Sequence, residues 1–397
     1  MGDAGGGNPD YLAGGGQGVV SHRPYRVVVL GGYGNFGARI CQALAQENGL
    51  AVIVAGRNGA RAAETAHRLT QSGCPARLEA SALDAGQADL AQALRALDAD
   101  LVTHTCGPFQ GQDYQVARAC IDAQAHYVDL ADAPSFVTGF AALDADARAA
   151  GVLAVSGASS VPALSAAVVD QLLPEFSALH AIDHGINPGN QTPRGLATVQ
   201  SILSYCGKPL RQWHDGQWRT VYGWQGLTRR RYPAPMGRRW LGYCDVPDLE
   251  LFPQRYPAVR EVVFRAGLEI RLLHLGTWVL SWLVRAGLVN NWRHHAPQLK
   301  RISEWFEGWG STRGGMHVEL QGLDHDGRPL RRCWTLLADS GDGPQIPCTA
   351  AVVMAKKLAR GEIDTAGAMP CLGFFTIEEF MQALAGFDVV AQLQEPQ

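Results

Sequence analysis

Three glycines near the start of the chain have the spacing of a phosphate-binding turn. Gly32, Gly34 and Gly37 follow an apolar run at residues 27–30, and apolar residues then recur at helical spacing as far as Leu44. This pattern predicts a strand, a tight turn and a helix whose N-terminal N–H groups can hold a pyrophosphate. The first glycine allows the turn, the second lets the pyrophosphate approach, and the third lets helix and strand pack closely. We expect a dinucleotide to contact the whole turn: Gly32, Tyr33, Gly34, Asn35, Phe36 and Gly37.

The residues after the second apolar run, residues 50–55, predict which dinucleotide binds. At this position a carboxylate accepts hydrogen bonds from a ribose hydroxyl, whereas an arginine accommodates a 2′-phosphate. Arg57 and Asn58 stand there, and the first carboxylate after them is Glu64. We therefore predict that both residues contact NADP, and NAD is the weaker candidate.

Two later predicted strands also end in residues suited to contact the dinucleotide. Asp84 follows the third strand and either contacts the adenine or caps a helix. Cys106, Gly107 and Pro108 follow the fourth strand, residues 100–105. Because such sheets bind ligands at the carboxyl ends of their strands, we expect this loop beside the nicotinamide half.

Hydride transfer to or from a nicotinamide usually needs one proton-transfer group nearby. Asp129 lies in the fifth predicted strand, residues 127–130, and Asp132 lies in the loop after it. We predict Asp132 as the proton-transfer residue, and we favour a turn-capping role for Asp129. Cys106 is a second candidate at the catalytic centre. No neighbour in the sequence would lower the pKa of its thiol, so we expect it to shape the pocket.

Arg194 is the candidate for binding a substrate carboxylate. Thr192 and Pro193 resemble the N-cap and first residue of a helix that ends at Gly207. Arg194 would then stand in the first turn, where the helix dipole disfavours a cation and an anion nearby would compensate. A surface ion pair is the alternative interpretation. For His184, in a predicted strand at residues 179–186, we expect a place on the surface or on a pocket wall.

Charge and cysteine usage exclude several classes of protein. The formal net charge of −3, with both signs interspersed, provides no basic field for nucleic acid. The nine cysteines are scattered and form no C-x-x-C, which argues against a disulfide framework and against a zinc site. We predict no metal site and a cytoplasmic location. Residues 1–23 lack the pattern of a signal peptide and are expected to form a flexible leader.

Elements of two kinds must position these residues. Strands and helices alternate over residues 24–157, which predicts a Rossmann-type, doubly wound parallel sheet. Beyond this, Asp-Gly turns at residues 215–216 and 326–327 predict hairpins, hence a mainly antiparallel sheet. We therefore expect an α/β chain whose residues 158–345 form an α+β domain for substrate binding and dimerisation. Residues 346–397 should return as helices to the first domain, the last of them capped at residues 376–379 and followed by a polar tail.

One predicted helix carries an unusual apolar seam. Seven residues repeat at alternating steps of four and three: Leu268, Leu272, Leu275, Val279, Trp282, Ala286 and Val289. Its longest uncharged run, residues 272–284, is 13 residues long, whereas a transmembrane helix needs about 20. We therefore predict no transmembrane span here. A core helix or the seam of a homodimer is the first interpretation, and peripheral membrane contact or a wall for an apolar substrate are the alternatives.

Five segments together resemble a known family. They are GYGNFG at residues 32–37, AGR at 55–57, CGPF at 106–109, YVDL at 127–130 and GASSVPALS at 157–165. The chain resembles the saccharopine dehydrogenase-like oxidoreductases over about residues 24–170, and more loosely from Gly315 onward. The resemblance implies an NADP-binding Rossmann domain, an inserted α+β substrate domain, and NAD(P)-linked interconversion of an amine-type bond with its imine.

Three functions remain open from the sequence. The first is an NADP-dependent oxidoreductase acting on an imine or secondary amine of an amino-acid-type substrate with a carboxylate. The second is a reductase of an apolar carbonyl or enoyl substrate, favoured by the tryptophans and by the seam at residues 268–289. The third is a non-catalytic protein that senses NADP, favoured by the lack of a catalytic signature.

Overall fold

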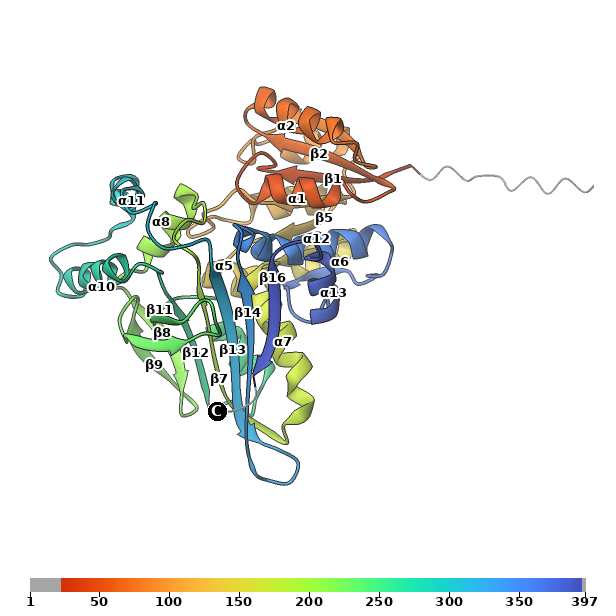
Figure 1. The fold of residues 1–397 in the computed structure, drawn as a ribbon. Coiled ribbons are helices and arrows are strands. Elements are labelled where there is room, and N and C mark those ends of the chain that lie inside the picture. The colour runs from red at the N-terminus through yellow and green to blue at the C-terminus, as the bar shows by residue number, and fades with distance from the viewer. Residues whose placement is uncertain (1–22, 395–397) are drawn as a thin grey trace, which may run out of the picture.

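Two β-sheets organise residues 23–394, the part of the chain that the computed structural model describes (Figure 1). The first sheet carries α2 (Gly59–Gln71) on one face and α1 (Gly37–Leu44) on the other. The second sheet lies beside it and is built mainly from the middle of the chain. The leader predicted at residues 1–23 lies outside the described residues except for Arg23.

The first sheet has seven strands in the order β15-β6-β5-β4-β1-β2-β3, and every pairing in it is parallel. Its strands are β1 (Tyr25–Leu30), β2 (Leu50–Gly56), β3 (Arg77–Ala82), β4 (Leu101–His104), β5 (His126–Asp129), β6 (Leu153–Ser156) and β15 (Gly367–Pro370). β2 is buried along its whole length, as expected for a continuous apolar run covered on both faces. Strand order reverses between β1 and β4, so ligands are expected above their carboxyl ends.

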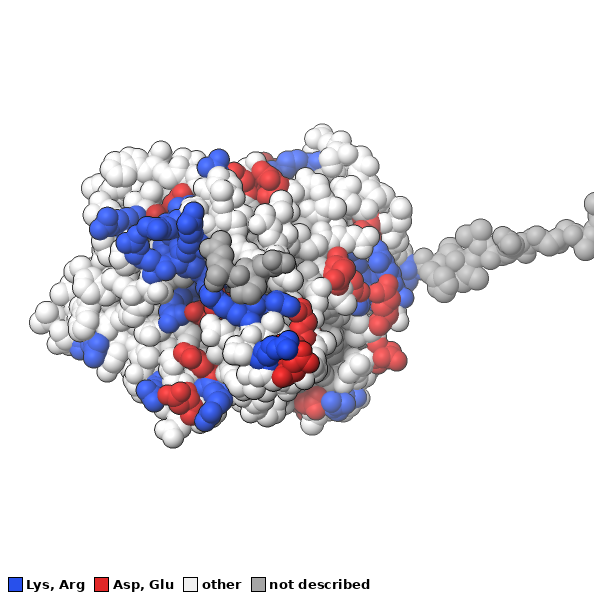
Figure 2. All heavy atoms as spheres, turned by 60° about the horizontal axis from the view of Figure 1, so that its bottom comes forward, with Lys and Arg blue, Asp and Glu red and all other residues white. Residues whose placement is uncertain are grey.

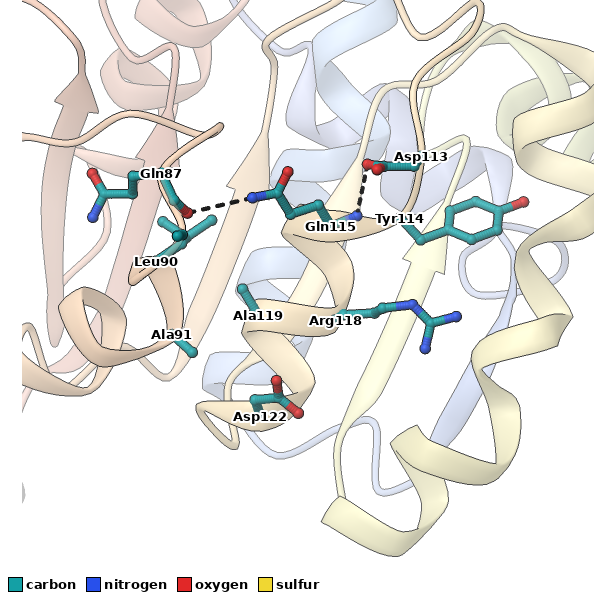
Figure 3. Close-up of a pocket in the computed structure, with 10 residues that line it drawn as sticks. Gln87, Leu90, Ala91, Asp113, Tyr114, Gln115, Arg118, Ala119 and Asp122 are labelled. Atoms are coloured by element: carbon teal, nitrogen blue, oxygen red, sulfur yellow. Dashed lines mark hydrogen bonds between the residues drawn. The ribbon is translucent and has the colours of Figure 1, made fainter.

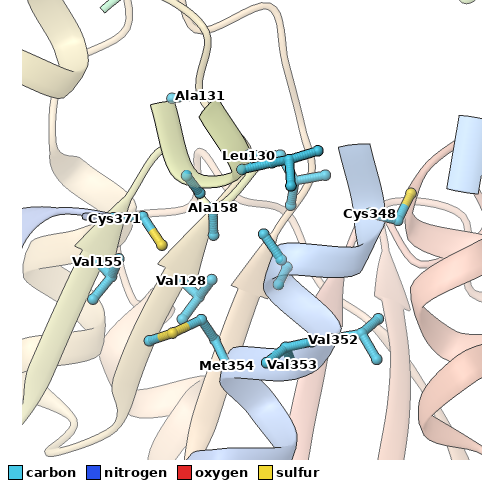
Figure 4. Packing of buried hydrophobic residues seen from close by; sticks show 14 of the residues in the cluster. Val128, Leu130, Ala131, Val155, Ala158, Cys348, Val352, Val353, Met354 and Cys371 are labelled. Atoms are coloured by element: carbon cyan, nitrogen blue, oxygen red, sulfur yellow. The ribbon is translucent and has the colours of Figure 1, made fainter. Parts of the chain in front are cut away.

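The helices of this domain are α1, α2, α3 (Leu90–Ala96), α4 (Gln115–Asp122), α5 (Pro134–Thr138), α6 (Asp144–Ala150), α12 (Ile346–Ala359) and α13 (Ile377–Ala383). α12 returns from the far end of the chain and is buried at ten of its fourteen residues. Figure 4 shows its Val352, Val353 and Met354 packed beside Val128 of β5. A helix that is apolar almost all round belongs inside a protein. The predicted capping box of Thr376 and Glu379 is confirmed.

The second sheet is mixed and has nine strands. Seven follow the order β10-β11-β12-β7-β13-β14-β16, and β8 joins at β12 and carries β9. The strands are β7 (Ala178–Asn187), β8 (Pro209–His214), β9 (Gln217–Tyr222), β10 (Thr228–Arg231), β11 (Arg238–Tyr243), β12 (Glu261–Ala266), β13 (Gly314–Leu323), β14 (Pro329–Ala338) and β16 (Val389–Gln394). Only the β12–β7 pairing is parallel. Both predicted hairpins form, and the predicted fold class is confirmed.

The helices beside the second sheet are α7 (Ser165–Leu172), α8 (Leu196–Ser204), α9 (Asp248–Arg255), α10 (Arg271–Arg285) and α11 (Ala296–Glu304). α8 begins later than predicted, with Gly195 and not Thr192 as its N-cap. Arg194 therefore stands before the helix and not in its first turn, so the dipole argument for an anion beside it was wrong.

The end of the chain differs from the predicted helices and polar tail. β15 pairs with β6 and completes the first sheet, whereas β16 pairs with β14 at the edge of the second sheet. A four-residue strand and a half-exposed edge strand carry a weak hydrophobic signal, so neither was recognised. Figure 2 shows a face of the molecule on which basic and acidic side chains both occur, in separate small groups.

Candidate active site at the junction of the two sheets

The glycines of the turn after β1 have roles that differ from the prediction. Gly31, not Gly32, takes the left-handed conformation, with φ of +81°. A Cβ on Gly32 would lie 2.9 Å from the Val29 carbonyl oxygen and 2.9 Å from Cγ1 of Val54. The first glycine of the motif is therefore needed for packing against β1 and β2, and the residue before it makes the bend.

The other two glycines of the motif differ in how much space they leave. A Cβ on Gly37 would lie 2.2 Å from the Gly31 carbonyl oxygen, so α1 and the turn pack closely as predicted. A Cβ on Gly34 would meet a single atom within 4 Å, the Gly31 oxygen at 3.0 Å. Gly34 is thus open to a ligand on its Cα side, which is the condition for a pyrophosphate to approach.

Backbone donors at the start of α1 are available to such an anion. Among the described residues, the N–H groups of Asn35, Phe36 and Gly37 donate to no protein acceptor. The Asn35 side chain is held instead by Arg39, whose Nη1 donates to Asn35 Oδ1 at 2.7 Å. Arg39, which the sequence analysis missed, places a cation next to these donors. The turn fits the pyrophosphate of a dinucleotide.

A second group of polar residues lies at the end of β2, where the ribose phosphate is expected. The Tyr33 ring packs where a Cβ on Gly56 would be, 2.6 Å from its nearest ring atom, so this position requires glycine. Tyr33 Oη accepts a hydrogen bond from the Asn58 N–H at 2.9 Å, and the guanidinium of Arg61 lies 4.7 Å from the ring centroid. The turn and the end of β2 are thereby fixed to each other.

Arg57, Asn58 and Arg61 are all exposed at this corner. Arg57 makes no hydrogen bond or ion pair with any described residue, and Asn58 caps α2 by accepting from the Arg61 N–H at 3.1 Å. Arg61 was also missed, although it stands one helical turn after Arg57. Two arginines and a helix N-terminus form a site suited to a phosphate.

Asp84 and Cys106 line the same edge of the sheet. Asp84 Oδ1 accepts from the Gly86 N–H at 3.0 Å, so its carboxylate shapes a local turn. Cys106 Sγ would lie 3.1 Å from a Cβ on Gly31, directly against the glycine-rich turn. Burial raises the pKa of the Cys106 thiol to about 11, while Arg57 opposes this shift. The thiol is therefore protonated at neutral pH, which agrees with a pocket-shaping role.

The loop after β4 is held in one conformation by its own side chains. Gln112 Nε2 donates to the carbonyl oxygens of Cys106 and Pro108, both at 2.9 Å. Phe109 is buried with its ring centroid 5.1 Å from that of His104. The loop predicted to lie beside the nicotinamide is thus held by hydrogen bonds next to the glycine-rich turn.

The two predicted carboxylates after β5 have different surroundings. Asp129 is fully buried and accepts four hydrogen bonds, from the N–H groups of Ala131 and Gly157 and from the hydroxyls of Ser156 and Tyr127, at 2.8 to 3.0 Å. Burial raises its pKa to about 6, and these hydrogen bonds oppose the shift. Every one of these contacts stays within the first domain, so Asp129 fixes turns there.

Asp132 instead connects the two domains. Its carboxylate accepts from Gln110 Nε2 and from the hydroxyl of Ser201 on α8, both at 3.1 Å. Gln110 Nε2 also contacts Ser201 Oγ at 2.7 Å. The side chain keeps contact with solvent, yet the atoms packed around it raise its pKa, against the effect of these two hydrogen bonds. A carboxyl group with a raised pKa that contacts both domains is suited to transfer protons.

The second domain contributes another carboxyl group beside Asp132. Tyr205, one helical turn after Ser201 on α8, has its hydroxyl 2.7 Å from Cys244 Sγ, and Asp245 follows directly. Burial raises the pKa of Asp245 to about 6, and the charges of Glu250 and Asp132 add to this shift. Asp245 was missed, because nothing in the sequence brings it near Asp132.

Two arginines are candidates for binding a substrate anion. Arg293 Nη1 reaches the Gln110 carbonyl oxygen at 3.4 Å, and its guanidinium forms no ion pair within residues 23–394. Arg194, the predicted candidate, donates to the carbonyl and side-chain oxygens of Asn190, both at 2.7 Å. Arg293, which the sequence analysis did not select, therefore lies nearer to the Asp132 group, and the role of Arg194 stays a prediction.

His184 is buried, contrary to the expected surface or pocket wall. Its Nε2 lies 3.0 Å from Asp248 Oδ1, and Ser165 Oγ donates to the same oxygen. Serine and histidine here share one carboxylate and do not contact each other in the order that activates a nucleophile. All three side chains are fully buried, so this cluster joins α7, β7 and α9 as a structural contact.

A depression of about 320 Å³ lies elsewhere on the first domain, between α3 and α4 (Figure 3). Gln115 donates across it to backbone oxygens at residues 86 and 87, and Asp113 and Arg118 lie on its α4 side. No residue predicted to bind the dinucleotide lines it. Within residues 23–394 no group of three or more potential ligands could hold a metal ion, and no helix is long and apolar enough to cross a membrane.

Comparisons with known proteins agree with this geometry. Residues 27–155 match the family described as the saccharopine dehydrogenase NADP binding domain. Apo histidine-tagged saccharopine dehydrogenase (L-Glu forming) from Saccharomyces cerevisiae superposes with a TM-score of 0.66 at 13% identity, over 94% of this chain and 100% of that chain. An amine dehydrogenase from Mycobacterium smegmatis superposes with a TM-score of 0.46 at 12% identity, over 88% of this chain and 95% of that chain.

No curated protein matches the sequence. The matched residues run from β1 to β6 and so include the glycine-rich turn, Arg57, the Cys106 loop and Asp132. The structural match extends through the second sheet. Residues 27–155 therefore resemble the saccharopine dehydrogenase NADP binding domain, and the chain as a whole has a saccharopine dehydrogenase-like fold.

Proposed function

We propose that the chain is an NADP-dependent oxidoreductase that interconverts a secondary amine and its imine in an amino-acid-type substrate. One observation carries the proposal most directly: Asp132, a carboxyl group with a raised pKa, lies between the cofactor edge of the first sheet and the second domain. The family match of residues 27–155 supports the cofactor, and the fold shared with a saccharopine dehydrogenase supports the type of bond.

When bound, the dinucleotide supplies or accepts the hydride. The turn from Gly32 to Gly37 holds its pyrophosphate, and Arg57, Asn58 and Arg61 hold the 2′-phosphate of NADP. The Cys106 loop shapes the pocket for the nicotinamide half. In the reductive direction Asp132 donates its proton to the substrate nitrogen, and in the oxidative direction its carboxylate takes that proton back.

Gln110 and Ser201 orient the Asp132 carboxyl group, since both contact it directly. An arginine, Arg293 or Arg194, binds the substrate carboxylate. The enoyl reductase hypothesis rested on the tryptophans and on the apolar seam of α10. Leu272, Val279 and Trp282 of that seam are exposed to solvent, so the seam no longer favours this hypothesis. We keep the cytoplasmic location and a homodimer as predictions.

The test is NADPH oxidation across a panel of amino acids paired with 2-oxo acids, with apolar enoyl and carbonyl compounds as the counter-panel. The proposal expects turnover with at least one amino acid pair and none with the counter-panel. Turnover with enoyl compounds alone would refute it. Tight NADPH binding without turnover on either panel would indicate the NADP-sensing function instead.

A further inference from the structure

Helix α10 has its apolar side outward. Its buried residues are His274, Ser281 and Val284, two of which are polar. The outward stripe includes Leu272, 59% exposed, Val279, 50% exposed, and Trp282, 43% exposed. These three belong to the seam predicted from the sequence. Of the first interpretation, a core helix or a dimer seam, the core helix was therefore wrong, and the dimer seam stays a prediction. An apolar stripe of this kind is expected to have a partner.

The apolar surface continues beyond α10. Leu288 follows the helix and is 74% exposed, and Ile302 and Trp305 of the α11 region are 43% and 76% exposed. Trp309 is 58% exposed. Seven of the eleven large apolar side chains that are exposed among residues 23–394 fall between residues 272 and 309. α10 and α11 project at one end of the molecule in Figure 1, and these side chains are exposed on that part of the chain.

The charges on the same segment are mostly positive. Residues 270–303 contain five basic residues and no aspartate or glutamate: Arg271, Arg285, Arg293, Lys300 and Arg301. Three acids flank these residues: Glu269 is paired with Arg239, Glu304 is paired with Lys300, and Glu307 is exposed between Trp305 and Trp309. The segment is thus apolar and basic at once, while the whole chain has a formal net charge of −3.

This charge pattern indicates whether a second copy of the chain or a lipid surface covers the exposed apolar side chains. A two-fold dimer would bring the same patch of each copy against the other, and the five basic residues of each copy would then face only two carboxylates, Glu304 and Glu307. An anionic lipid surface complements them, and tryptophan and leucine on exposed helices are suited to the boundary between head groups and acyl chains. We propose that α10, α11 and the loop between them bind the surface of an anionic lipid bilayer, without crossing it.

The experiment is flotation of the full chain, loaded with NADPH, with vesicles of phosphatidylcholine alone or with one quarter phosphatidylglycerol. We expect binding to the anionic vesicles and at least tenfold weaker binding to the neutral ones. Added salt should weaken binding, because each basic residue near such a surface contributes about fivefold in affinity. Equal binding to both vesicles would overturn the charge argument, and no binding to either would overturn the proposal.

Matched variants locate the contact. Trp305→Ser combined with Leu288→Ser should lower binding at least tenfold, whereas Trp218→Ser, an exposed tryptophan on β9, should leave it unchanged. Arg271→Gln combined with Arg301→Gln should lower binding roughly twentyfold, whereas Arg328→Gln in the β13–β14 turn should not. NADPH titration reports whether each variant is folded.

A dimer is the competing occupant of this face, and sedimentation without lipid tests for it. If the chain forms a dimer that Leu272→Glu dissociates, and does not bind vesicles, the proposal is wrong and a second copy covers the helices. Equal loss of vesicle binding in the patch variants and in the Trp218 and Arg328 controls would also contradict it. None of these outcomes depends on the substrate, so the proposal is tested separately from the enzymatic function.

Discussion

The nucleotide edge and the Asp132 junction differ in how far apart their residues lie in the chain. The glycine-rich turn, the end of β2 and the start of α2 come from residues 31–61, and local geometry fixes them. The junction brings together Gln110 and Asp132 of one domain with Ser201 and Asp245 of the other. Its hydrogen bonds depend on how the two domains pack, whereas the turn is complete within one of them. Changes at the turn that leave its packing intact should therefore affect cofactor binding alone, and changes at the junction should affect turnover.

The largest expected effect is at Gly34. Gly34→Val should abolish dinucleotide binding, because the new side chain fills the approach of the pyrophosphate. The fold should survive, since Gly34 has a backbone conformation open to other residues and only the Gly31 oxygen lies close. Fluorescence titration with NADPH measures the loss, and the thermal midpoint reports the fold. Normal NADPH binding by a folded variant would place the site elsewhere.

The opposite control is Gly37→Val. Its Cβ would lie 2.2 Å from a backbone oxygen, so we expect loss of stability along with loss of binding. If Gly37→Val were as stable as the wild type, the close packing of α1 on the turn would be contradicted.

The next largest effect is at Asp132. Asp132→Asn should lower kcat by about 10² to 10⁴, the usual contribution of a general acid or base, and leave NADPH affinity unchanged. Steady-state kinetics with the best substrate pair from the panel measures this. Ser201→Ala, which removes one contact to Asp132, should have a smaller effect on kcat. An unchanged kcat for Asp132→Asn would mean that the junction holds the domains together without acting in the reaction.

Cofactor choice should depend on the end of β2. Arg57→Asp should weaken NADPH binding by one to two orders of magnitude, about 1.4 kcal/mol per factor of ten, because a guanidinium there is replaced by a repelling carboxylate. NADH binding should change much less. Arg61→Ala, which removes the second cation of this corner, should weaken NADPH binding less than Arg57→Asp. Equal losses for NADPH and NADH would show that Arg57 does not contact the 2′-phosphate.

Substrate binding should distinguish the two arginines. A charge-assisted hydrogen bond contributes about 1.5–3 kcal/mol, so loss of the arginine that binds the substrate carboxylate should raise KM about tenfold or more. We expect this for Arg293→Ala, and we compare it with Arg194→Ala under the same conditions. NADPH affinity is the control for both variants. If only Arg194→Ala raises KM, the original sequence-based choice is correct.

The smallest expected effect is on the pH dependence of the reductive rate. Asp132 must be protonated to donate, so the rate should fall as the pH rises through its raised pKa. Asp245→Asn removes a neighbouring negative charge, and this should lower the pKa of Asp132. The decrease in rate should then occur at a pH lower by less than about one unit. A pH–rate profile of both proteins measures the shift. A shift to higher pH would contradict the electrostatic contact between the two carboxyl groups.

The sequence predicted local geometry well and packing between distant segments poorly. The turn, the strand alternation and the Asp-Gly hairpins were recognised because each depends on neighbouring residues. Asp132 was selected because strand ends of a parallel sheet share one edge. Ser201, Asp245 and Arg293 were not, because only the packing of the second domain brings them to that edge.

Helix α10 illustrates the same limit. Its seam was recognised from the spacing of Leu272, Val279 and Trp282, but the side that faces the protein was not. Burial of His274 and Ser281 depends on what packs against them, and a hydrophobic repeat carries no information about that. The predicted position of His184 was wrong for a related reason, because its partners Asp248 and Ser165 come from two other elements.

The strands β15 and β16 come late in the chain, so the two sheets can be completed only late in synthesis. β15 is an edge strand of the first sheet, and β16 is an edge strand of the second. Helix α12 packs against the apolar face of the first sheet beside β5. Neither sheet is complete before residues 367–394 have left the ribosome. Each domain is thus discontinuous in the chain, and the unfinished sheets leave strand edges and apolar surface exposed until the last step. A fragment of residues 24–157 would lack both β15 and the buried helix α12.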